Sequence, residues 1–140
     1  MENVAFEVRR GWSRYVERKK TGLWALEEMY EAHKPEKHLE VIASVGGCVV
    51  GYLGVRDRTS HPYRIHSRGT WVVDALRGCG IATQLWALCL AESKAKTVAM
   101  FVVSDEGFTL AESLRERFPR VTWDVTLDSL RPRDLRKRVA

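Results

Sequence analysis

The sequence has few cysteines and no long apolar run, and both shortages narrow what the protein can be. Its three cysteines, Cys48, Cys79 and Cys89, are odd in number, widely spaced and outside any CxxC pattern. They therefore predict neither a disulfide framework nor a zinc site. The four histidines form no HExxH pattern, so no metal site is expected. Because no stretch resembles a secretory signal or a membrane span, we expect a cytoplasmic protein without a membrane partner.

The length and composition of the chain are those of one globular domain. It has 140 residues, of which 45% are hydrophobic and 29% are charged. This composition is typical of a protein with a buried core rather than of a disordered or collagen-like chain. Since a chain of this size leaves little room for a second core, we expect a single domain over residues 1–140.

Positive charge exceeds negative charge and is concentrated in two blocks. The net charge is +5. The first block covers residues 9–20, and the second is a basic tail at residues 131–140. Such blocks attract anions, and the candidates are nucleic acid, an acidic substrate or the phosphates of a cofactor. A solvated surface or a disordered tail is the plainer alternative.

A β-hairpin is the clearest local signal in the chain. Two β-branched runs, residues 40–45 and 48–55, are joined by Gly46 and Gly47, and a two-residue glycine turn is typical of a hairpin. Residues 63–73 contain further β-branched and aromatic side chains. They predict a third antiparallel strand.

The remaining elements are predicted from periodicity and turn residues. Residues 12–32 approach helical spacing but are interrupted near Gly22, which indicates two short helices or one broken helix before a loop at Pro35. The other expected elements are a strand at residues 4–8, for which a helical start is the alternative, a helix at 81–92, a strand at 98–103, a helix at 108–118 and a strand at 121–127.

The junction between the third strand and the helix after it carries the main chemical signal. The chain runs from the strand into Arg77-Gly78-Cys79-Gly80-Ile81-Ala82-Thr83. Gly78 and Gly80 permit a tight turn and the close approach of a ligand, and the first amides of a helix bind anions. A diphosphate is the natural ligand of such a turn, although a purely structural connection would have the same composition.

This run resembles the R/Q-x-x-G-x-G/A motif of the GNAT superfamily of N-acetyltransferases. Arg77 matches the first position of the motif and Ala82 the last, while Val73 matches the hydrophobic residue four positions before it. The hairpin, the helix after the motif and the strand at 98–103 resemble the rest of the acetyl-CoA-binding core. The resemblance covers about residues 40–127, where motif, position and element order coincide.

The resemblance implies a fold and a cofactor. The fold is an α+β mixed sheet, mostly antiparallel and flanked by helices, that splays open between the strand ending near residue 74 and the strand at 98–103. Acetyl-CoA is the implied acyl donor. The backbone of Val72 and Val73 would hydrogen-bond its pantetheine arm, and the amides of residues 78–83 would hold its pyrophosphate. The implied cofactor-binding residues are Val72, Val73, Arg77, Gly78, Cys79, Gly80, Ile81, Ala82 and Thr83.

The sequence departs from the family at the usual catalytic positions. Many members carry an N-x-x-A-x-x-L-Y pattern after the last core strand. Alignment on Ala111 and Leu114 places Phe108 at the Asn position and Arg115 at the Tyr position. Water or another side chain is then left to reprotonate the thiolate that departs when the amine attacks the thioester.

Three residues are candidates for catalysis, and each has a structural alternative. Asp74, just before the turn, is a candidate base acting through water, or a turn cap. His66 lies near the start of its strand and is a candidate because the unperturbed pKa of histidine is close to neutral pH; a solvent-facing side chain is the alternative. Ser104 follows the strand at 98–103, where ligands of mixed sheets bind, together with Asp105 and Glu106. These three residues equally suit the N-cap and first turn of the next helix.

Other reactive and aromatic side chains have plainer interpretations. Cys79 lies inside the motif and is expected to point outward rather than to carry an acyl group. Tyr52 and Tyr63 are alternatives for the missing tyrosine. The five tryptophans are interpreted as core residues or as part of a homodimer interface.

Three functions remain open. The leading one is an acetyl-CoA-dependent N-acetyltransferase that acts on a primary amine of unknown identity. The second is a GNAT-fold protein that modifies nucleic acid, either a DNA base or an aminoacyl-tRNA, which the basic blocks favour. The third is a non-catalytic binding module, for which the missing Asn and Tyr are the evidence.

Overall fold

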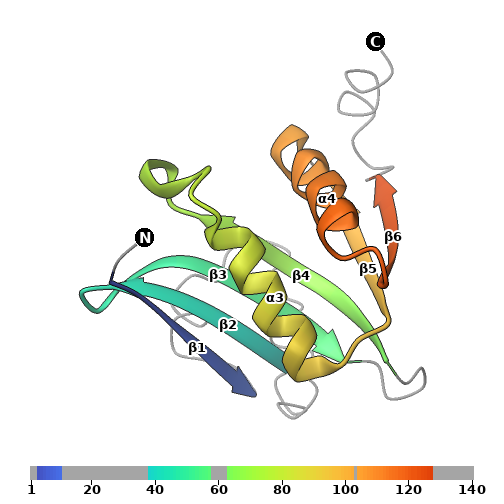
Figure 1. Ribbon diagram of the computed structural model, residues 1–140, viewed down its shortest axis with the longest axis horizontal. Helices are drawn as coiled ribbons and strands as arrows, with labels where there is room; N and C mark the ends of the chain where they lie inside the picture. The colour runs from blue at the N-terminus through green and yellow to red at the C-terminus, as the bar shows by residue number, and fades with distance from the viewer. Residues whose placement is uncertain (1–2, 11–37, 58–62, 103, 128–140) are drawn as a thin grey trace, which may run out of the picture.

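The computed structural model describes residues 3–10, 38–57, 63–102 and 104–127. These ranges include the predicted hairpin, the predicted phosphate-binding turn and the two helices after it (Figure 1). The helices expected at 12–32, the loop at Pro35 and the basic tail at 131–140 lie outside the described residues.

Six strands form one sheet in chain order. The strands are β1 (Val4–Arg10), β2 (His38–Val45), β3 (Cys48–Asp57), β4 (Arg64–Val72), β5 (Thr97–Val102) and β6 (Thr122–Leu127). The first four pair antiparallel, whereas β5 joins β4 and β6 joins β5 in parallel. The predicted mixed, mostly antiparallel sheet is therefore confirmed.

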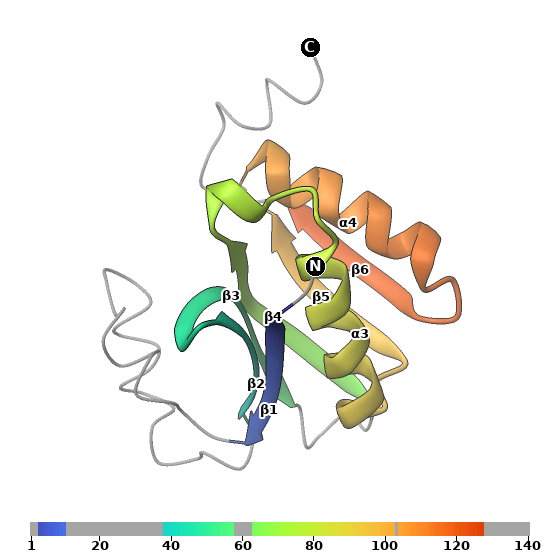
Figure 2. The same ribbon diagram turned by 60° about the vertical axis from the view of Figure 1, so that its left-hand side comes forward.

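Two helices cover one face of this sheet. Helix α3 (Ile81–Ser93) lies across β1 to β4, and helix α4 (Asp105–Arg117) lies beside β5 and β6 (Figures 1 and 2). Leu85 of α3, Leu114 of α4 and Val98 of β5 belong to one buried apolar cluster, so the two helices pack on the same side. Neither helix in this described part of the chain is long and apolar enough to cross a bilayer.

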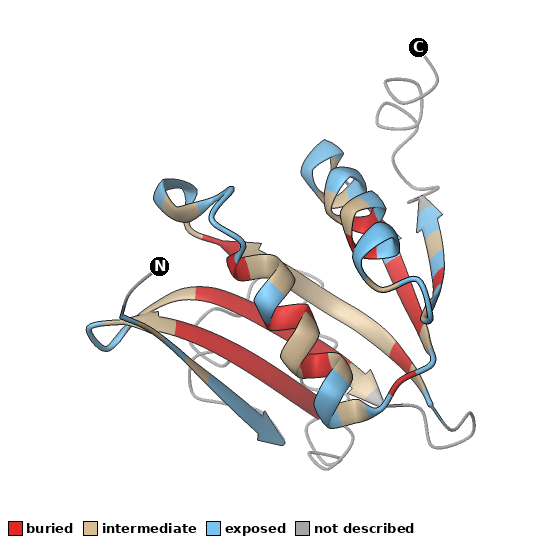
Figure 3. Ribbon diagram, viewed as in Figure 1, coloured by how far each residue is buried: buried red, intermediate tan, exposed pale blue. Residues whose placement is uncertain are grey.

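Strand alternation decides which side chains meet α3. Leu39 and Val41 of β2 and Leu53 of β3 are at most 1% exposed and belong to the cluster under the helix, as the period of two along a strand requires. Gly51 permits the closest approach, because a Cβ there would lie 3.0 Å from the Ile81 Cγ2 atom. The buried core therefore lies between α3 and the middle of the sheet (Figure 3).

The opposite face of β2 and β3 holds a buried polar pair. Glu40 and Tyr52 are each 1% exposed, and the Tyr52 hydroxyl donates a hydrogen bond of 2.8 Å to the Glu40 carboxylate. Gly54 makes room for this hydroxyl, since a Cβ at Gly54 would lie 2.7 Å from it. The pair satisfies two groups whose burial would otherwise cost free energy.

The sheet opens between β4 and β5. Their pairing is limited to Arg64–His66 of β4 against Thr97–Ala99 of β5, so the last pair is His66 with Ala99. Beyond it the two strands diverge (Figure 1). The register of β3 with β4 also shifts next to Gly54, and Arg68 is the extra residue in β4, a bulge that bends the strand. The predicted opening between these two strands is confirmed.

Most predicted element boundaries hold to within one or two residues, and one does not. Helix α4 begins at Asp105, three positions before the expected start at Phe108. The Ser104 hydroxyl accepts a hydrogen bond of 3.1 Å from the Gly107 amide. Ser104 is therefore the N-cap, and Asp105 and Glu106 are in the first turn, as the structural alternative for these residues predicted. N-cap geometry of this kind stabilises a helix start that hydrophobic periodicity alone does not reveal.

Candidate functional site

The turn between β4 and α3 is shaped by two glycines in the left-handed region. Strand β4 ends at Val72, and a short 3-10 turn, η2 (Asp74–Leu76), follows it. Gly78 has φ 81° and Gly80 has φ 86°, values that other residues adopt only with strain. Both glycines face open space, with no atom within 4 Å of a Cβ built on them.

This turn presents backbone donors at the start of α3. Gly80 is the N-cap, and its carbonyl accepts the amide of Gln84 at 3.0 Å. The amides of Ile81, Ala82 and Thr83 precede that first intrahelical bond, so no helical carbonyl pairs with them. The first turn of α3 holds no acidic side chain that would offset the positive end of the helix dipole. These groups fit a pyrophosphate.

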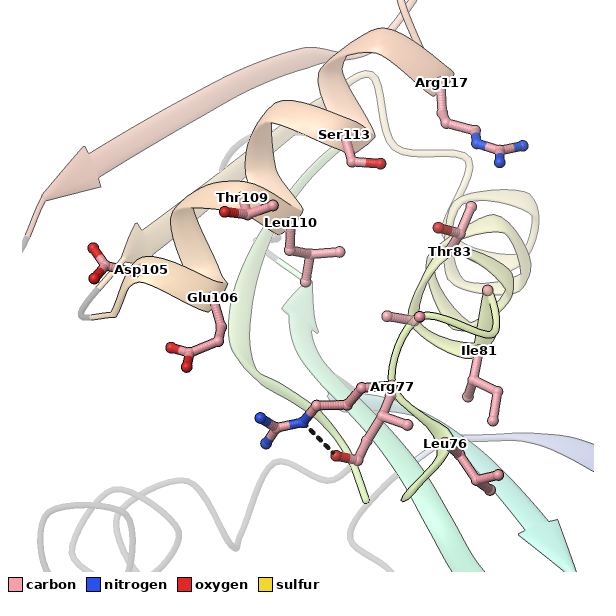
Figure 4. A pocket seen from close by; sticks show the side chains of 14 residues that line it. Leu76, Arg77, Ile81, Thr83, Asp105, Glu106, Thr109, Leu110, Ser113 and Arg117 are labelled. Carbon is pink, nitrogen blue, oxygen red and sulfur yellow. Dashed lines mark hydrogen bonds between the residues drawn. The ribbon is translucent and has the colours of Figure 1, made fainter. Parts of the chain in front are cut away.

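A cavity of about 620 Å³ lies between this turn and α4 (Figure 4). Its lining residues come from the end of β4, the turn, the first turn of α3 and one side of α4. They are Val72, Leu76, Arg77, Gly78, Gly80, Ile81, Ala82, Thr83, Asp105, Glu106, Thr109, Leu110, Ser113 and Arg117. Because Val72 ends β4 and α4 follows β5, the cavity is at the wide end of the opening between these strands.

Charge is unevenly distributed over this cavity. Along α4, Glu106, Leu110, Ser113 and Arg117 recur at helical spacing, so the wall changes from acidic to basic over about 16 Å. In Figure 4, Arg77 lies toward Glu106, whereas Thr83 lies toward Arg117. One end of the cavity therefore holds the carboxylates of Asp105 and Glu106 together with Arg77, whose charge is paired with Asp74, and the other end is basic at Arg117.

Arg77 is held against the end of β4. Its Nε atom donates a hydrogen bond of 3.2 Å to the Val72 carbonyl, and its guanidinium lies 3.1 Å from the Asp74 carboxylate. The Val73 amide donates to the Val50 carbonyl at 2.9 Å, and the Val73 carbonyl accepts from Leu76 at 3.0 Å. Both backbone groups of Val73 are thus already paired, while the Val72 carbonyl adjoins the cavity.

The three candidate catalytic residues are not brought together in the cavity. Asp74 lies in η2 rather than at the end of a strand, and its side chain is 90% exposed beside Arg77. Ser104 caps α4. His66 belongs to the last residue pair that joins β4 to β5, and it is partly buried. None of the three lines the cavity, and neither do Val73 and Cys79; Cys79 is exposed.

Sequence reasoning missed the α4 side of the cavity. Thr109, Leu110, Ser113 and Arg117 line it. All four lie in the expected helix at 108–118, and their spacing of three and four was the available signal that they share one face. The Glu40–Tyr52 pair was missed as well. Its signal is a glutamate in a run that is otherwise β-branched and apolar.

The described residues hold no group of three His, Cys, Asp or Glu side chains that is close enough to bind a metal ion.

Comparisons with known proteins identify the family. Residues 6–108 match the model of the acetyltransferase (GNAT) family, which spans more than half of the chain. A search of curated proteins found no match.

Solved structures share the fold at low sequence identity. A ribosomal-protein-alanine N-acetyltransferase from Brucella melitensis biovar Abortus 2308 has a TM-score of 0.53 and 18% identity, over 79% of this chain and 89% of that one. The aminoglycoside antibiotic 6′-N-acetyltransferase AAC(6′)-IG from Acinetobacter haemolyticus has a TM-score of 0.59 and 16% identity, over 77% and 88%. AAC(6′)-Iy, bound to the bisubstrate analogue CoA-S-monomethyl-acetylneamine, has a TM-score of 0.55 and 14% identity, over 81% and 88%.

The family model confirms the predicted family and its enzymatic class, and acetyl-CoA is the acyl donor that this family uses. The acceptor is a separate question, because likeness at this level of identity shows the fold alone. The chain belongs to the acetyltransferase (GNAT) family.

Proposed function

We propose that the protein transfers an acetyl group from acetyl-CoA to a primary amine. The observation that carries this proposal is the cavity at the wide end of the β4–β5 opening, which combines a glycine turn and the donor end of α3 with the wall of α4. A phosphate group there interacts with the helix dipole and with charge-assisted hydrogen bonds.

The residues that hold the cofactor are proposed from this geometry. The amides of Ile81, Ala82 and Thr83 bind the pyrophosphate, and Gly78 and Gly80 keep side chains away from it. The Val72 carbonyl is the acceptor for an amide of the pantetheine arm, since both backbone groups of Val73 are paired within the protein. Arg77 shares that carbonyl and keeps the end of β4 in place.

His66 is the proposed acceptor of the amine proton. Ile65 belongs to the cluster under α3, so alternation along β4 directs His66 to the opposite face, at the narrow end of the opening. Acetyl-CoA supplies a thioester that an amine attacks directly, and positioning the amine beside a base is then the main contribution of the protein.

Asp74 and Ser104 have less support as bases. Asp74 is exposed and paired with Arg77, and the Ser104 hydroxyl is engaged in capping α4. Loss of turnover in His66→Gln at an unchanged dissociation constant for CoA would support His66; unchanged turnover would exclude it.

The names of the structural neighbours suggest which acceptor amines to test first. Ribosomal-protein alanine and an aminoglycoside antibiotic are the acceptors named for those proteins, and they are the first acceptors to test here. The nucleic-acid alternative depends on the two basic blocks, of which only Arg9 and Arg10 are described. Binding to DNA or RNA that weakens steeply with salt would support it.

The proposal is tested by isothermal titration of the purified protein with acetyl-CoA and with CoA, followed by an acetylation screen over peptide amines and aminoglycosides. Saturable binding of both ligands, and release of CoA in the presence of one class of amine, are the expected results. Absence of binding would contradict the cofactor site and leave the non-catalytic binding module as the better explanation.

A further inference from the structure

We propose that Arg117 binds the 3′-phosphate of CoA and makes the protein prefer CoA to 3′-dephospho-CoA. This inference rests on the proposed function, because it concerns the same cavity, and it adds the residue that selects the nucleotide end of the donor.

The charge distribution of the cavity decides where the nucleotide end lies. With the pyrophosphate at the amides of Ile81 to Thr83, the 3′-phosphate can be directed toward Glu106 or toward Arg117. At neutral pH the 3′-phosphate carries up to two negative charges, and like charges within a few ångströms repel each other. The end that contains Asp105 and Glu106 therefore disfavours it, and the end that contains Arg117 favours it.

Arg117 is available for an anion. Within the described ranges its side chain has no ion pair and no hydrogen bond, in contrast to Arg77, which is engaged with Val72 and Asp74. It is exposed at the end of α4 and lines the cavity. An arginine presents several N–H donors in a plane that matches phosphate oxygens.

Hydroxyl groups continue this basic end. Ser113 lies one turn before Arg117 on the same side of α4, and Thr83 lies toward Arg117 from α3 (Figure 4). Both hydroxyls can donate to phosphate oxygens. The basic end therefore offers a cation and two neutral donors from two different helices, which is suited to a phosphate monoester.

The test is a comparison of two ligands on three forms of the full chain. Isothermal titration measures the dissociation constants of CoA and 3′-dephospho-CoA for the wild type, Arg117→Ala and Arg115→Ala. Arg115 is the matched control, because it is an exposed arginine in the same last turn of α4 but does not line the cavity.

The wild type is expected to bind CoA about tenfold more tightly than 3′-dephospho-CoA, as one charge-assisted hydrogen-bonded pair warrants. Arg117→Ala should bring the two constants together by weakening CoA alone, and Arg115→Ala should keep the preference. The preference should also shrink at high salt.

Equal binding of the two ligands by the wild type would overturn the proposal, and so would a preference that survives in Arg117→Ala. These outcomes leave the cofactor site intact, because CoA still binds. Failure of the wild type to bind either ligand would instead refute the cofactor site itself, and the role of Arg117 with it.

Discussion

At the scale of single residues, Gly80 and Gly47 have nearly the same backbone conformation in different places. Their φ angles are 86° and 82°, and at both positions a Cβ would have no atom within 4 Å of it. Valine at either site is therefore strained by conformation and not by collision, at a cost of about 1–2 kcal/mol. Only Gly80 is at the start of α3.

We expect Gly80→Val to abolish CoA binding and Gly47→Val to leave it unchanged, with similar losses of stability. Isothermal titration and urea unfolding of both variants measure the two effects separately. A folded Gly80→Val protein that binds CoA as the wild type does would refute the assignment of the glycine turn.

Gly54 is a second residue whose substitution has a defined effect. Its Cβ would lie 2.7 Å from the Tyr52 hydroxyl, which is buried and bonded to Glu40. Gly54→Ala should therefore destabilise the protein by about 1–3 kcal/mol through overpacking. Tyr52→Phe alone should cost a similar amount, because it leaves the buried carboxylate without this donor.

A double-mutant cycle in urea tests whether these two residues interact. The double variant Gly54→Ala, Tyr52→Phe should lose less stability than the sum of the single losses, since the nearest atom that the new methyl group meets, the hydroxyl oxygen, is gone. Strict additivity would show that Tyr52 does not pack over Gly54.

At the scale of elements, Ser104 distinguishes a structural role from a catalytic one. Its hydroxyl accepts the Gly107 amide at the start of α4, so Ser104→Ala should lower the free energy of unfolding by about 1 kcal/mol. Ser104→Asp should restore it, because aspartate also caps helices. Thermal unfolding checks both variants. A variant Ser104→Ala with full stability and no turnover would instead return Ser104 to the catalytic candidates.

The elements also show what the sequence could predict. The Gly46-Gly47 hairpin and the helix after the glycine motif have strong local signals, and both lie where expected. The start of α4 lies three residues before the expected one, because a capping serine and an acidic first turn contribute nothing to hydrophobic periodicity. The cavity wall on α4 was missed for another reason: Thr109, Leu110, Ser113 and Arg117 lie inside the expected helix, but only the placement of α4 opposite the turn before α3 makes them a wall.

The pairing of strands that are far apart in the chain could not be predicted from local sequence patterns. The bulge at Arg68 and the limit of β4–β5 pairing at His66 depend on register between strands far apart in the chain. The splayed sheet was predicted from the family resemblance and not from the residues of β4 or β5 themselves. The burial of Glu40 was likewise invisible, because its partner Tyr52 comes from the neighbouring strand.

At the scale of the whole molecule, the strand pairing that joins the two parts of the sheet is short. Three residue pairs connect β4 to β5. Beside them, Trp86 of α3 meets Trp123 of β6 edge to face, with ring centroids 5.5 Å apart. Trp86 is fully buried and Trp123 is 7% exposed. This aromatic contact therefore stabilises the packing of the antiparallel part of the sheet against its parallel part.

A ligand in the cavity should also hold these two parts together. The residues that line the cavity come from α3 and the turn before it on one side and from α4 on the other. A ligand that binds only the folded protein adds about 2.7 kcal/mol of stability at 100 times its dissociation constant. We therefore expect saturating CoA to raise the melting temperature by several degrees.

The variant Trp123→Leu should lose about 2–4 kcal/mol of folding stability when CoA is absent, and it should regain part of this stability when CoA is added. In differential scanning calorimetry, Gly80→Val is the control that CoA should not stabilise. A CoA shift that persists in Gly80→Val would mean that the stabilising ligand binds outside this cavity.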